Sequence, residues 1–257
     1  MTQLKDYCDR YPSIRMEREE GILSLAFHTA GGPLQWSVAI HAEFADAFND
    51  IARDTENRVM IVTGTGDLFS GPRAATNPII VTDVLEWDHI MRVGNRMLTT
   101  FLDIEALVIT CINGPALRHV EIPLLGDIVL AAEDSYLQDS AHFINNRIPG
   151  DGVNLVMSEL MGLNRAKYFL LTGQQLSANE AKDLGLVNEL MPRAQLRDRA
   201  LQLARQLNRQ NPIIQRGTRR LFTERLRQVM QRSLAYGIAV EGFGALETGR
   251  SAPEARP

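Results

Sequence analysis

Residues 112–152 read INGPALRHVEIPLLGDIVLAAEDSYLQDSAHFINNRIPGDG, and this stretch decides the fold. The β-branched run at 107–112 leads into it and stops at the turn signal Asn113-Gly114-Pro115, which predicts a core strand. Residues 127–132 form a second apolar run of strand length, and residues 148–152 form a tight loop that opens another helix. Buried strands that alternate with helical segments are typical of an α/β domain.

Candidate site residues gather in the same stretch. It contains two of the five histidines, His119 and His142, with Glu121, Asp139 and Asp151 close by in sequence. A short helix is expected to begin near His119, and its free backbone N–H groups would attract an anion. Because each histidine lies beside an apolar run that anchors it, we expect two imidazoles and a loop carboxylate to meet in one cleft.

The flanking segments predict the remaining architecture. An antiparallel edge hairpin, an amphipathic helix capped by Ser37, a central parallel strand and a second amphipathic helix are expected, in that order, at residues 14–28, 37–52, 59–63 and 87–102. From residue 195 to residue 242 the pattern is mostly helical, with a break at Asn211-Pro212. We therefore expect an α/β core at 1–195 and a C-terminal helical region at 196–257.

The bulk composition excludes several classes of protein. With 45% hydrophobic and 23% charged residues, the 257-residue chain has the composition of a globular protein with a sizeable core. Its net charge of −4 gives no reason to expect nucleic acid or an anionic membrane as a partner. Cys8 and Cys111 are far apart and lack metal-ligand spacing, which favours a reducing compartment. Because no segment is typical of a signal peptide or a membrane span, a cytoplasmic location is expected.

The expected C-terminal helices carry two further features. Residues 216–232 contain many arginines opposed only by Glu224, and because the whole chain is acidic we interpret this run as a solvated helix face or a trimer contact. Glu241 lies in the apolar and small-residue segment 238–246. A carboxylate there is either a partly buried hydrogen-bond acceptor or a functional group.

Short motifs spread over most of the chain resemble the crotonase superfamily, which has the enoyl-CoA hydratase/isomerase fold. They lie at residues 59–64, 66, 69–71, 113–117, 127–131, 148–150, 171–173 and 181–188. Together these motifs are specific, although no single one is. The resemblance implies a crotonase-like (ClpP/crotonase) spiral of ββα units with a C-terminal helical trimerisation region, in a homotrimer or a dimer of trimers.

Within that superfamily the chain is similar to the β-diketone hydrolases of the 6-oxocamphor hydrolase type. The matching residues are Trp36, His41, 119–123, 141–143, 149–152 and Glu241. The resemblance implies a retro-Claisen hydrolysis without metal or coenzyme, in which a non-enolisable cyclic 1,3-diketone is cleaved at a C–C bond to a keto acid. It implies catalytic roles for His142, Asp151, His119, Trp36 and Glu241. It implies substrate-binding roles for His41, Gly71, Glu121 and Phe143, although a lone helical histidine such as His41 by itself favours a surface or capping role.

Two loops depart from the thioester-binding pattern of the superfamily. In the loop 64–76, Gly71 is kept as a backbone donor to an oxyanion, but Pro72 and Arg73 replace small residues, and proline has no N–H to donate. In the following loop, Arg118-His119-Val120 stands where consecutive glycines are usual. An imidazole therefore takes the place of bare backbone.

The resemblance also assigns the acid–base groups. By position, Glu121 corresponds to the first catalytic glutamate of the hydratases, and His142 replaces the second, so the base there is expected to titrate near ~6.5 instead of ~4.3. If Asp151 accepts from one ring nitrogen of His142, the other nitrogen is left to take a proton from water. The enolate formed on cleavage needs a hydrogen-bond donor, for which His119 and Trp36 Nε1 are the candidates.

Three alternatives stay open at this point. The chain could be a coenzyme A-dependent hydratase, isomerase or thioesterase, because fold alone does not fix function. It could be a metal hydrolase that uses His119, His142 and Asp151, although no HExxH-type spacing supports this. It could also be a non-catalytic binding or scaffold protein in which both histidines are structural. A bound thioester, a metal in the purified protein, or inertness towards diketones would identify each in turn.

Overall fold

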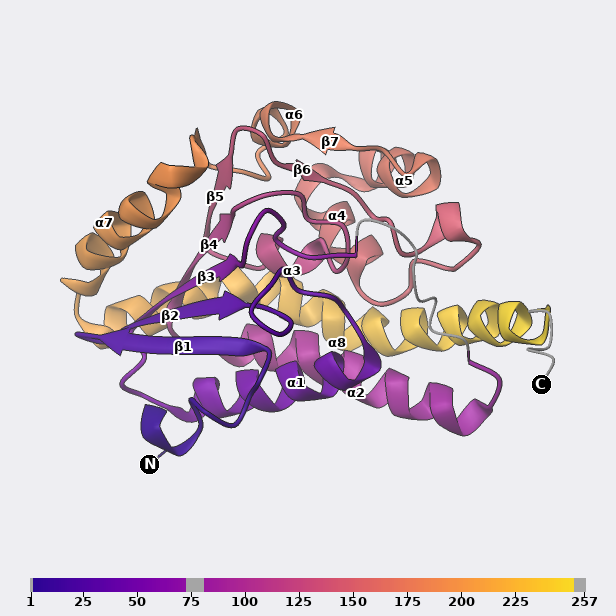
Figure 1. Cartoon of the computed structure of the whole chain (residues 1–257), viewed down its shortest axis with the longest axis horizontal. Helices are drawn as coiled ribbons and strands as arrows, with labels where there is room; N and C mark the ends of the chain where they lie inside the picture. Colours follow the sequence, from indigo (N-terminus) through magenta and orange to yellow (C-terminus); the bar gives the residue numbers. More distant parts are fainter. Residues whose placement is uncertain (1, 73–80, 252–257) are drawn as a thin grey trace.

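A computed structural model describes residues 2–72 and 81–251, and its centre is a six-stranded sheet (Figure 1). The strand order is β1-β2-β3-β4-β5-β8, with β1 antiparallel to β2 and every other pair parallel. The strands are β1 (Ile14–Glu19), β2 (Ile22–Phe27), β3 (Val59–Gly64), β4 (Leu107–Ile112), β5 (Ile128–Ala132) and β8 (Glu189–Met191). The expected edge hairpin, the central strand and the two strands around residue 112 are thereby confirmed.

Helices cover both faces of this sheet. The longer ones are α1 (Val38–Arg53), α2 (Val84–Asp103), α4 (Val153–Met161), α5 (Leu163–Thr172), α7 (Leu196–Asn208) and α8 (Pro212–Ser251), with the short α3 (Glu121–Leu124) and α6 (Ala178–Asp183) between strands. Ser37 caps α1 as expected, since its Oγ accepts from the Ile40 N–H at 3.3 Å. Helices α1, α2 and α8 lie on one side of the sheet, and α7 crosses the other (Figure 1).

Alternation along the strands produces one apolar cluster on each face. In β3, Met60 and Val62 join the large cluster under α1 and α2, whereas Val59 and Ile61 join the smaller cluster under α7. Side chains that alternate in this way, all at most 6% exposed, identify β3 as a strand buried on both faces. The sheet is therefore a fixed platform for the loops that leave its strands.

The loops after β3 and β4 pair with each other and build the second layer. Single backbone bridges join Gln35 to Gly71, Ser70 to Ala116 and Ala116 to Leu137, and Leu137 belongs to the two-stranded sheet of β6 (Tyr136–Leu137) and β7 (Leu176–Ser177). This pairing carries the chain from residue 112 to residue 152 across one end of the main sheet. The short helix α3 begins at Glu121, close to His119 as expected, but a single turn of helix gives no basis for the expected anion site.

The C-terminal helix α8 is fastened to the core by the basic run. Arg219, 1% exposed, donates through Nε to Ile104 O at 2.6 Å, and its Nη1 is 2.6 Å from Asp127 Oδ2. Arg220 and Arg227 pair with Glu105 and Asp103, and Arg225 pairs with Glu159. The interpretation of this run as a solvated face is therefore wrong for the buried Arg219, whereas Arg220 and Arg225 are exposed as expected and also pair with neighbouring elements.

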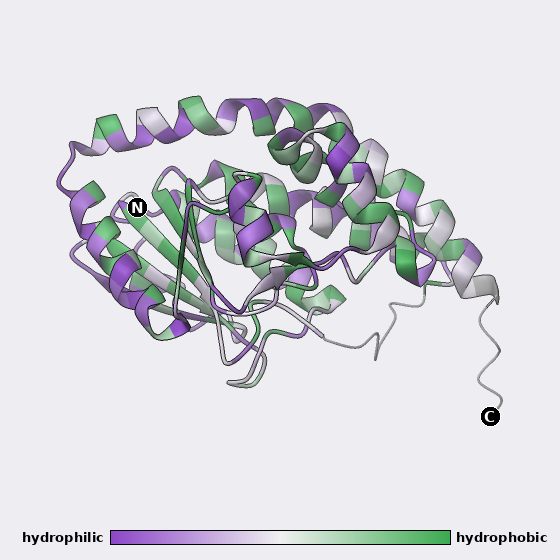
Figure 2. Cartoon of the chain, turned by 90° about the horizontal axis from the view of Figure 1, so that it is seen from above, coloured by the Kyte–Doolittle hydropathy of each residue, from purple (hydrophilic) through white to green (hydrophobic). Residues whose placement is uncertain are grey.

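Helix α8 also mixes apolar and polar residues along its length, as the alternating colours along it in Figure 2 show. Met230, Leu234 and Ile238 join the core, whereas others are exposed, namely Ile213, Ile214, Leu221, Phe222, Tyr236 and Phe243. Among residues 2–72 and 81–251, none of the helices combines the length and apolarity that a membrane span requires. The division of the chain at residue 195 stays a prediction.

Candidate active site

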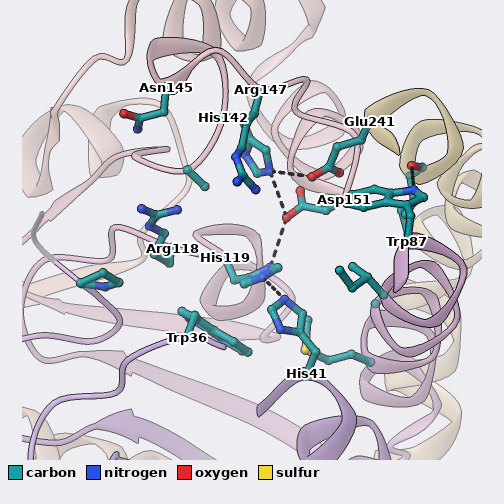
Figure 3. Close-up of a pocket in the computed structure, with 16 residues that line it drawn as sticks. Trp36, His41, Trp87, Arg118, His119, His142, Asn145, Arg147, Asp151 and Glu241 are labelled. Atoms are coloured by element: carbon teal, nitrogen blue, oxygen red, sulfur yellow. Dashed lines mark hydrogen bonds and ion pairs between the residues drawn. The ribbon is translucent and has the colours of Figure 1, made fainter. Parts of the chain in front are cut away.

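One cavity of about 300 Å³ gathers most of the expected site residues (Figure 3). Trp36 and His41 enter it from the start of α1, His119 from the loop after β4, and His142 and Asp151 from the segment before α4, while α8 contributes Glu241. Arginines, two apolar helix faces and a second tryptophan complete the wall: Arg118, Arg147, Trp87, Ile90, Met97 and Ile238. Segments distant in sequence therefore meet in one cleft, as expected.

His142 lies between carboxylates on both sides of its ring. Its Nδ1 is 2.9 and 3.0 Å from the two oxygens of the buried Asp139, while Nε2 is 3.4 Å from Asp151 Oδ2 and 3.6 Å from Glu241 Oε1. The expectation that Asp151 fixes the tautomer is therefore corrected, because Asp139 makes the direct contact. Two carboxylates near Nε2, both beyond an ideal hydrogen-bond distance, leave this nitrogen facing the cavity.

His119 belongs to a second chain of contacts. Its Nδ1 is 2.7 Å from Glu121 Oε1 and 3.4 Å from Asp151 Oδ2, and its Nε2 is 2.7 Å from His41 Nε2. His41 Nδ1 is 2.6 Å from the Ser37 carbonyl, so it carries a proton, and His41 Nε2 accepts from His119. Asp151 is thus shared between the two catalytic candidates, as the dashed lines in Figure 3 show.

The two histidine chains differ in charge. Burial disfavours the imidazolium of His142, but Asp151 and Asp139 outweigh it and hold its pKa well above the usual value. Burial, together with the neighbouring His119, lowers the pKa of His41 to about 3, so this ring is neutral. Burial raises the Asp151 pKa, but His142 and His119 reverse this and leave the pKa lowered. The sequence-based expectation of ~6.5 for His142 is therefore too low, because this reference value leaves out the charges of Asp151 and Asp139.

The proton on His119 is held jointly with Glu121. Burial opposes charge on His119, but Glu121 and then Asp151 raise its pKa. Burial also raises the pKa of Glu121, whose side chain is completely enclosed behind His119. A hydrogen bond of 2.7 Å between the two groups lets the pair keep one proton between them.

The backbone at His119 adopts a conformation that favours glycine. Its φ is +49°, in the left-handed region that few residues with a side chain adopt. Such a residue costs about 1–3 kcal/mol and persists only where its surroundings hold it. The loop thus keeps a backbone suited to glycine but places an imidazole against Asp151.

Two glycines let α8 approach the loop that carries Asp151. A Cβ on Gly150 would lie 2.1 Å from Gly237 O, and a Cβ on Gly237 would lie 2.5 Å from Gly150 O. Neither distance is tolerable for a real side chain, so only glycine permits this contact. The contact, together with the 3.1 Å hydrogen bond from Trp87 Nε1 to Ile238 O, brings Glu241 to His142.

Trp36 supplies a donor without a partner. Its indole packs against His119, with ring centroids 4.4 Å apart, and its Nε1 is buried with no hydrogen-bond acceptor among the described residues. A buried N–H without an acceptor costs about 1–3 kcal/mol, which a bound carbonyl group would offset. Trp36 is therefore ready to donate to a ligand.

Other expected site residues do not face the cavity. The Gly71 N–H donates to Leu34 O at 2.9 Å, so the expected oxyanion donor is already occupied. Phe143 is 52% exposed in the 3-10 helix Phe143–Asn145 and is not part of the cavity wall, and Glu121 acts only from behind His119. Pro72 lines the cavity, whereas Arg73 lies outside the described residues.

Sequence reasoning assigned no role to four residues of the site. Asp139 stands three positions before His142, a spacing that could have identified it as the partner of the ring. Arg118, Arg147 and Trp87 line the cavity, but no local pattern distinguishes them from surface or core residues. The surface interpretation of His41 is wrong, because α1 turns this residue inward to 8% exposure.

Two groups of side chains have the composition and spacing of metal ligands. In His119, Glu121 and Asp151, and likewise in His142, Asp151 and Glu241, one ligand atom from each residue lies within 4.8 Å of the others. In the first group, His119 and Glu121 form a direct hydrogen bond of 2.7 Å, which occupies the two atoms that would otherwise bind a metal ion. The second has contacts of 3.4 and 3.6 Å, which suit N and O ligands around one ion.

Comparison with known proteins places the chain in a family. The sequence profile of the enoyl-CoA hydratase/isomerase family matches residues 35–242. Hydroxycinnamoyl-CoA hydratase-lyase of Pseudomonas fluorescens is 25% identical over 225 residues, which cover 85% of this chain and 81% of that protein. An enoyl-CoA hydratase/isomerase of Bacillus subtilis is 30% identical over 198 residues, covering 75% and 72%.

Among solved structures, the chain is similar to a β-diketone hydrolase from the cyanobacterium Anabaena sp. PCC 7120 that was determined with bound (S)-3-oxocyclohexyl acetic acid. The TM-score is 0.91 at 39% identity, over 95% of this chain and 98% of that one. An enoyl-CoA hydratase/isomerase from Mycobacterium paratuberculosis has a TM-score of 0.85 at 22% identity, over 93% and 96% of the two chains, a likeness of fold alone. The chain belongs to the enoyl-CoA hydratase/isomerase family, the crotonase superfamily.

Proposed function

We propose that this protein is a β-diketone hydrolase that cleaves a C–C bond of non-enolisable cyclic 1,3-diketones by attack of water. The observation that carries the proposal is the arrangement of His142, with Asp139 on Nδ1 and with Nε2 turned into the cavity beside Asp151. A histidine oriented by a carboxylate is a general base for water. The 39% identity to the Anabaena β-diketone hydrolase supports the same assignment.

In the proposed reaction, His142 in its neutral form takes a proton from a water molecule at Nε2. The water oxygen bonds to one carbonyl carbon of the diketone and leaves its negative charge on the carbonyl oxygen. The bond from that carbon to the central carbon then breaks, and its electron pair becomes the enolate of the second carbonyl. The imidazolium returns its proton to the enolate carbon, so diketone and water yield one keto acid. A base placed in this way contributes about 10²–10⁴ in rate.

Three groups assist these steps. The unpartnered Trp36 Nε1 donates to the second carbonyl, where the enolate charge develops. Glu241 Oε1, 3.6 Å from Nε2 of His142, accepts from the attacking water, which lies beside this pair of atoms and contacts both. His119 has both ring nitrogens engaged, so it acts by positioning Asp151 and by holding a positive charge near the developing enolate.

Cavity size restricts the substrate to a compact molecule. A volume of about 300 Å³ lies at the lower end of the ~300–1,000 Å³ typical of small-molecule sites. The keto acid bound by the Anabaena protein gives a bridged bicyclic 1,3-diketone if its carboxyl carbon is rejoined to the ring carbon that lies next to the ketone and opposite the carbon bearing the side chain. Its central carbon is a bridgehead, which cannot enolise. We propose this class of bicyclic diketone as substrate.

The test is turnover of a bicyclic or 2,2-disubstituted cyclic 1,3-diketone by coenzyme-free protein in the presence of a chelator. Loss of diketone and formation of keto acid are followed together, with His142→Ala as the inactive variant and an exposed-site variant as control. Cleavage by the wild type alone is the expected result. No cleavage across several ring sizes would remove the proposal, and thioester substrates would be tested next.

A coenzyme A-dependent hydratase or isomerase is the second candidate, since the curated relatives above carry such names. The occupied Gly71 N–H counts against it, because that donor is needed for a thioester oxygen.

A homotrimer or dimer of trimers is also proposed, supported by the exposed apolar residues of α8 such as Leu221 and Phe222. The mass of the protein in solution, measured by light scattering, would test the proposed trimer or dimer of trimers.

A further inference from the structure

We propose that Arg118 is the anion-binding catalytic residue of the cavity: it stabilises the oxyanion formed when water adds to the carbonyl, and then holds the carboxylate of the product. The proposal rests on the proposed function for the origin of the anion. It assigns the first carbonyl to Arg118 and the second carbonyl to Trp36. Each developing charge therefore has its own donor.

The first observation is that Arg118 is a cation in the cavity wall without a partner. Its Nε is buried and has no hydrogen-bond acceptor, and no ion pair to its guanidinium exists within residues 2–72 and 81–251. Burial lowers its pKa although Asp139 and Asp151 attract the guanidinium, so the site on its own disfavours the charge on Arg118. The Arg118 backbone is fixed, since Ser70 Oγ donates to its carbonyl at 2.7 Å.

Two other poorly exposed arginines, Arg219 and Arg18, do have anions. Arg219 is 2.6 Å from Asp127 Oδ2, and the largely enclosed Arg18 reaches Asp54 at 2.7 Å as well as Glu56. Withdrawing a guanidinium from water is unfavourable unless hydrogen bonds and an opposite charge replace the water. Arg118 departs from this pattern where a ligand would enter, which points to an anionic ligand group as its missing partner.

The second observation is that the backbone and ring N–H groups expected to serve the substrate are already engaged or are needed elsewhere. The Gly71 N–H is bonded to Leu34 O, and Arg118-His119-Val120 occupies the place where glycines usually bring a second backbone donor. Both nitrogens of His119 are engaged, and Trp36 is needed for the enolate. A guanidinium presents several N–H groups in one plane, which suits an oxyanion that becomes a two-oxygen carboxylate.

The charge changes during the reaction fit this placement. Addition of hydroxide puts a full negative charge on an oxygen that was neutral in the substrate, so a fixed cation stabilises the intermediate more than the ground state. After C–C cleavage the same carbon is a carboxyl group, which ionises beside Arg118. Product acid should therefore bind more tightly than an uncharged ketone of the same shape.

The experiment measures binding of (S)-3-oxocyclohexyl acetic acid and of its methyl ester by calorimetry, in wild type, Arg118→Met and Arg118→Lys. The matched control is Arg92→Met, which removes an exposed arginine of α2 whose partner is Asp88. In Arg118→Met we expect the acid to bind about 10- to 100-fold more weakly, with ester binding unchanged and a fall of similar size in kcat for diketone cleavage. Arg118→Lys should recover part of both losses, and Arg92→Met should behave as wild type.

Three other outcomes decide the matter. Equal weakening of acid and ester in Arg118→Met would show damage to the cavity and overturn the proposal. Unchanged acid binding with a shifted pH profile would also overturn it, since Arg118 would then act only on the charges of Asp139 and Asp151. If the wild type cleaves no diketone but binds the acid through Arg118, the anion site stands and the proposed hydrolase function falls.

Discussion

Replacing Asp139 by asparagine removes one of the two carboxylates that hold the proton on His142. The contacts of Asp139 with Nδ1 are 2.9 and 3.0 Å, and its side chain is buried, so water screens the interaction poorly. Two unit charges about 4 Å apart interact by about 4 kcal/mol at an effective dielectric constant of about 20, which corresponds to about three pKa units. Because Asp151 keeps its charge and the cavity admits solvent, we expect the His142 pKa to fall by about 1–3 units in Asp139→Asn.

The expected result in activity has two parts. General-base catalysis needs neutral His142, so kcat/KM rises with pH through its raised pKa, and this acidic limb should move to lower pH in Asp139→Asn. The plateau should fall by about 10²-fold, because the ring becomes a weaker base and loses its orienting charge.

Two assays check this prediction independently. Initial rates of diketone cleavage over pH give the limb, and the NMR shift of the His142 ring proton gives the pKa without any substrate. Asp88→Asn, an exposed carboxylate paired with Arg92 on α2, is the matched control and should leave both unchanged. An unmoved pKa in a folded Asp139→Asn variant would refute the reasoning that Asp139 sets the basicity of His142.

Three further predictions concern the geometry and stability of the site. In Gly237→Ala, the new Cβ would lie 2.5 Å from Gly150 O, so the loop with Asp151 and helix α8 must move apart. Diketone turnover should then fall by about 10²-fold. An unchanged rate would show that the distance between this loop and α8 does not matter for catalysis. Arg219→Met leaves Asp127 without its cation and should lower the free energy of unfolding in urea by about 3–5 kcal/mol, whereas a loss below about 1 kcal/mol would mean that the pair behaves as an exposed one. The pKa of His41 is lowered from 6.5 in the unfolded chain to about 3 in the folded protein. Between these two pH values the unfolded chain binds a proton at His41 that the folded protein does not, so the free energy of unfolding decreases as the pH falls through this window. The variant His41→Gln contains the same other titrating groups, so their contributions cancel when the two proteins are compared. Relative to this variant, the free energy of unfolding of the wild type should fall by about 1 kcal/mol for each pH unit within the window. A difference between the two proteins that stays constant with pH would contradict the lowered pKa of His41.

Local patterns predicted the elements that frame the site. The β-branched run of β4, the N-cap Ser37 and the helix break at Asn211-Pro212 each act through near neighbours in the chain, and each lies where it was expected. Family motifs added Trp36, His119, His142, Asp151 and Glu241, and the cavity brings all five together. Their chemical roles stay predictions until variants are assayed.

Contacts across the fold could not be predicted in this way. The position of Glu241 beside His142 depends on the register of α8, which the close contact of Gly150 with Gly237 fixes. The engagement of the Gly71 N–H by Leu34 O depends on a bridge between two loops, which leaves no periodic signal in sequence. Both details decide which donors remain for a substrate, so site chemistry was less predictable than fold.

The left-handed backbone of His119 sets stability and activity against each other. With φ at +49°, any residue bearing a side chain is strained there, and glycine would relieve about 1 kcal/mol or more of that strain. The ring of His119 also partners the enclosed Glu121. A screen for heat tolerance alone should therefore enrich glycine at position 119 once Glu121 is replaced by an apolar residue as well, and would then discard the imidazole that holds Asp151. Engineering this protein for robustness consequently requires that turnover be scored in the same round as melting temperature, with this position held constant.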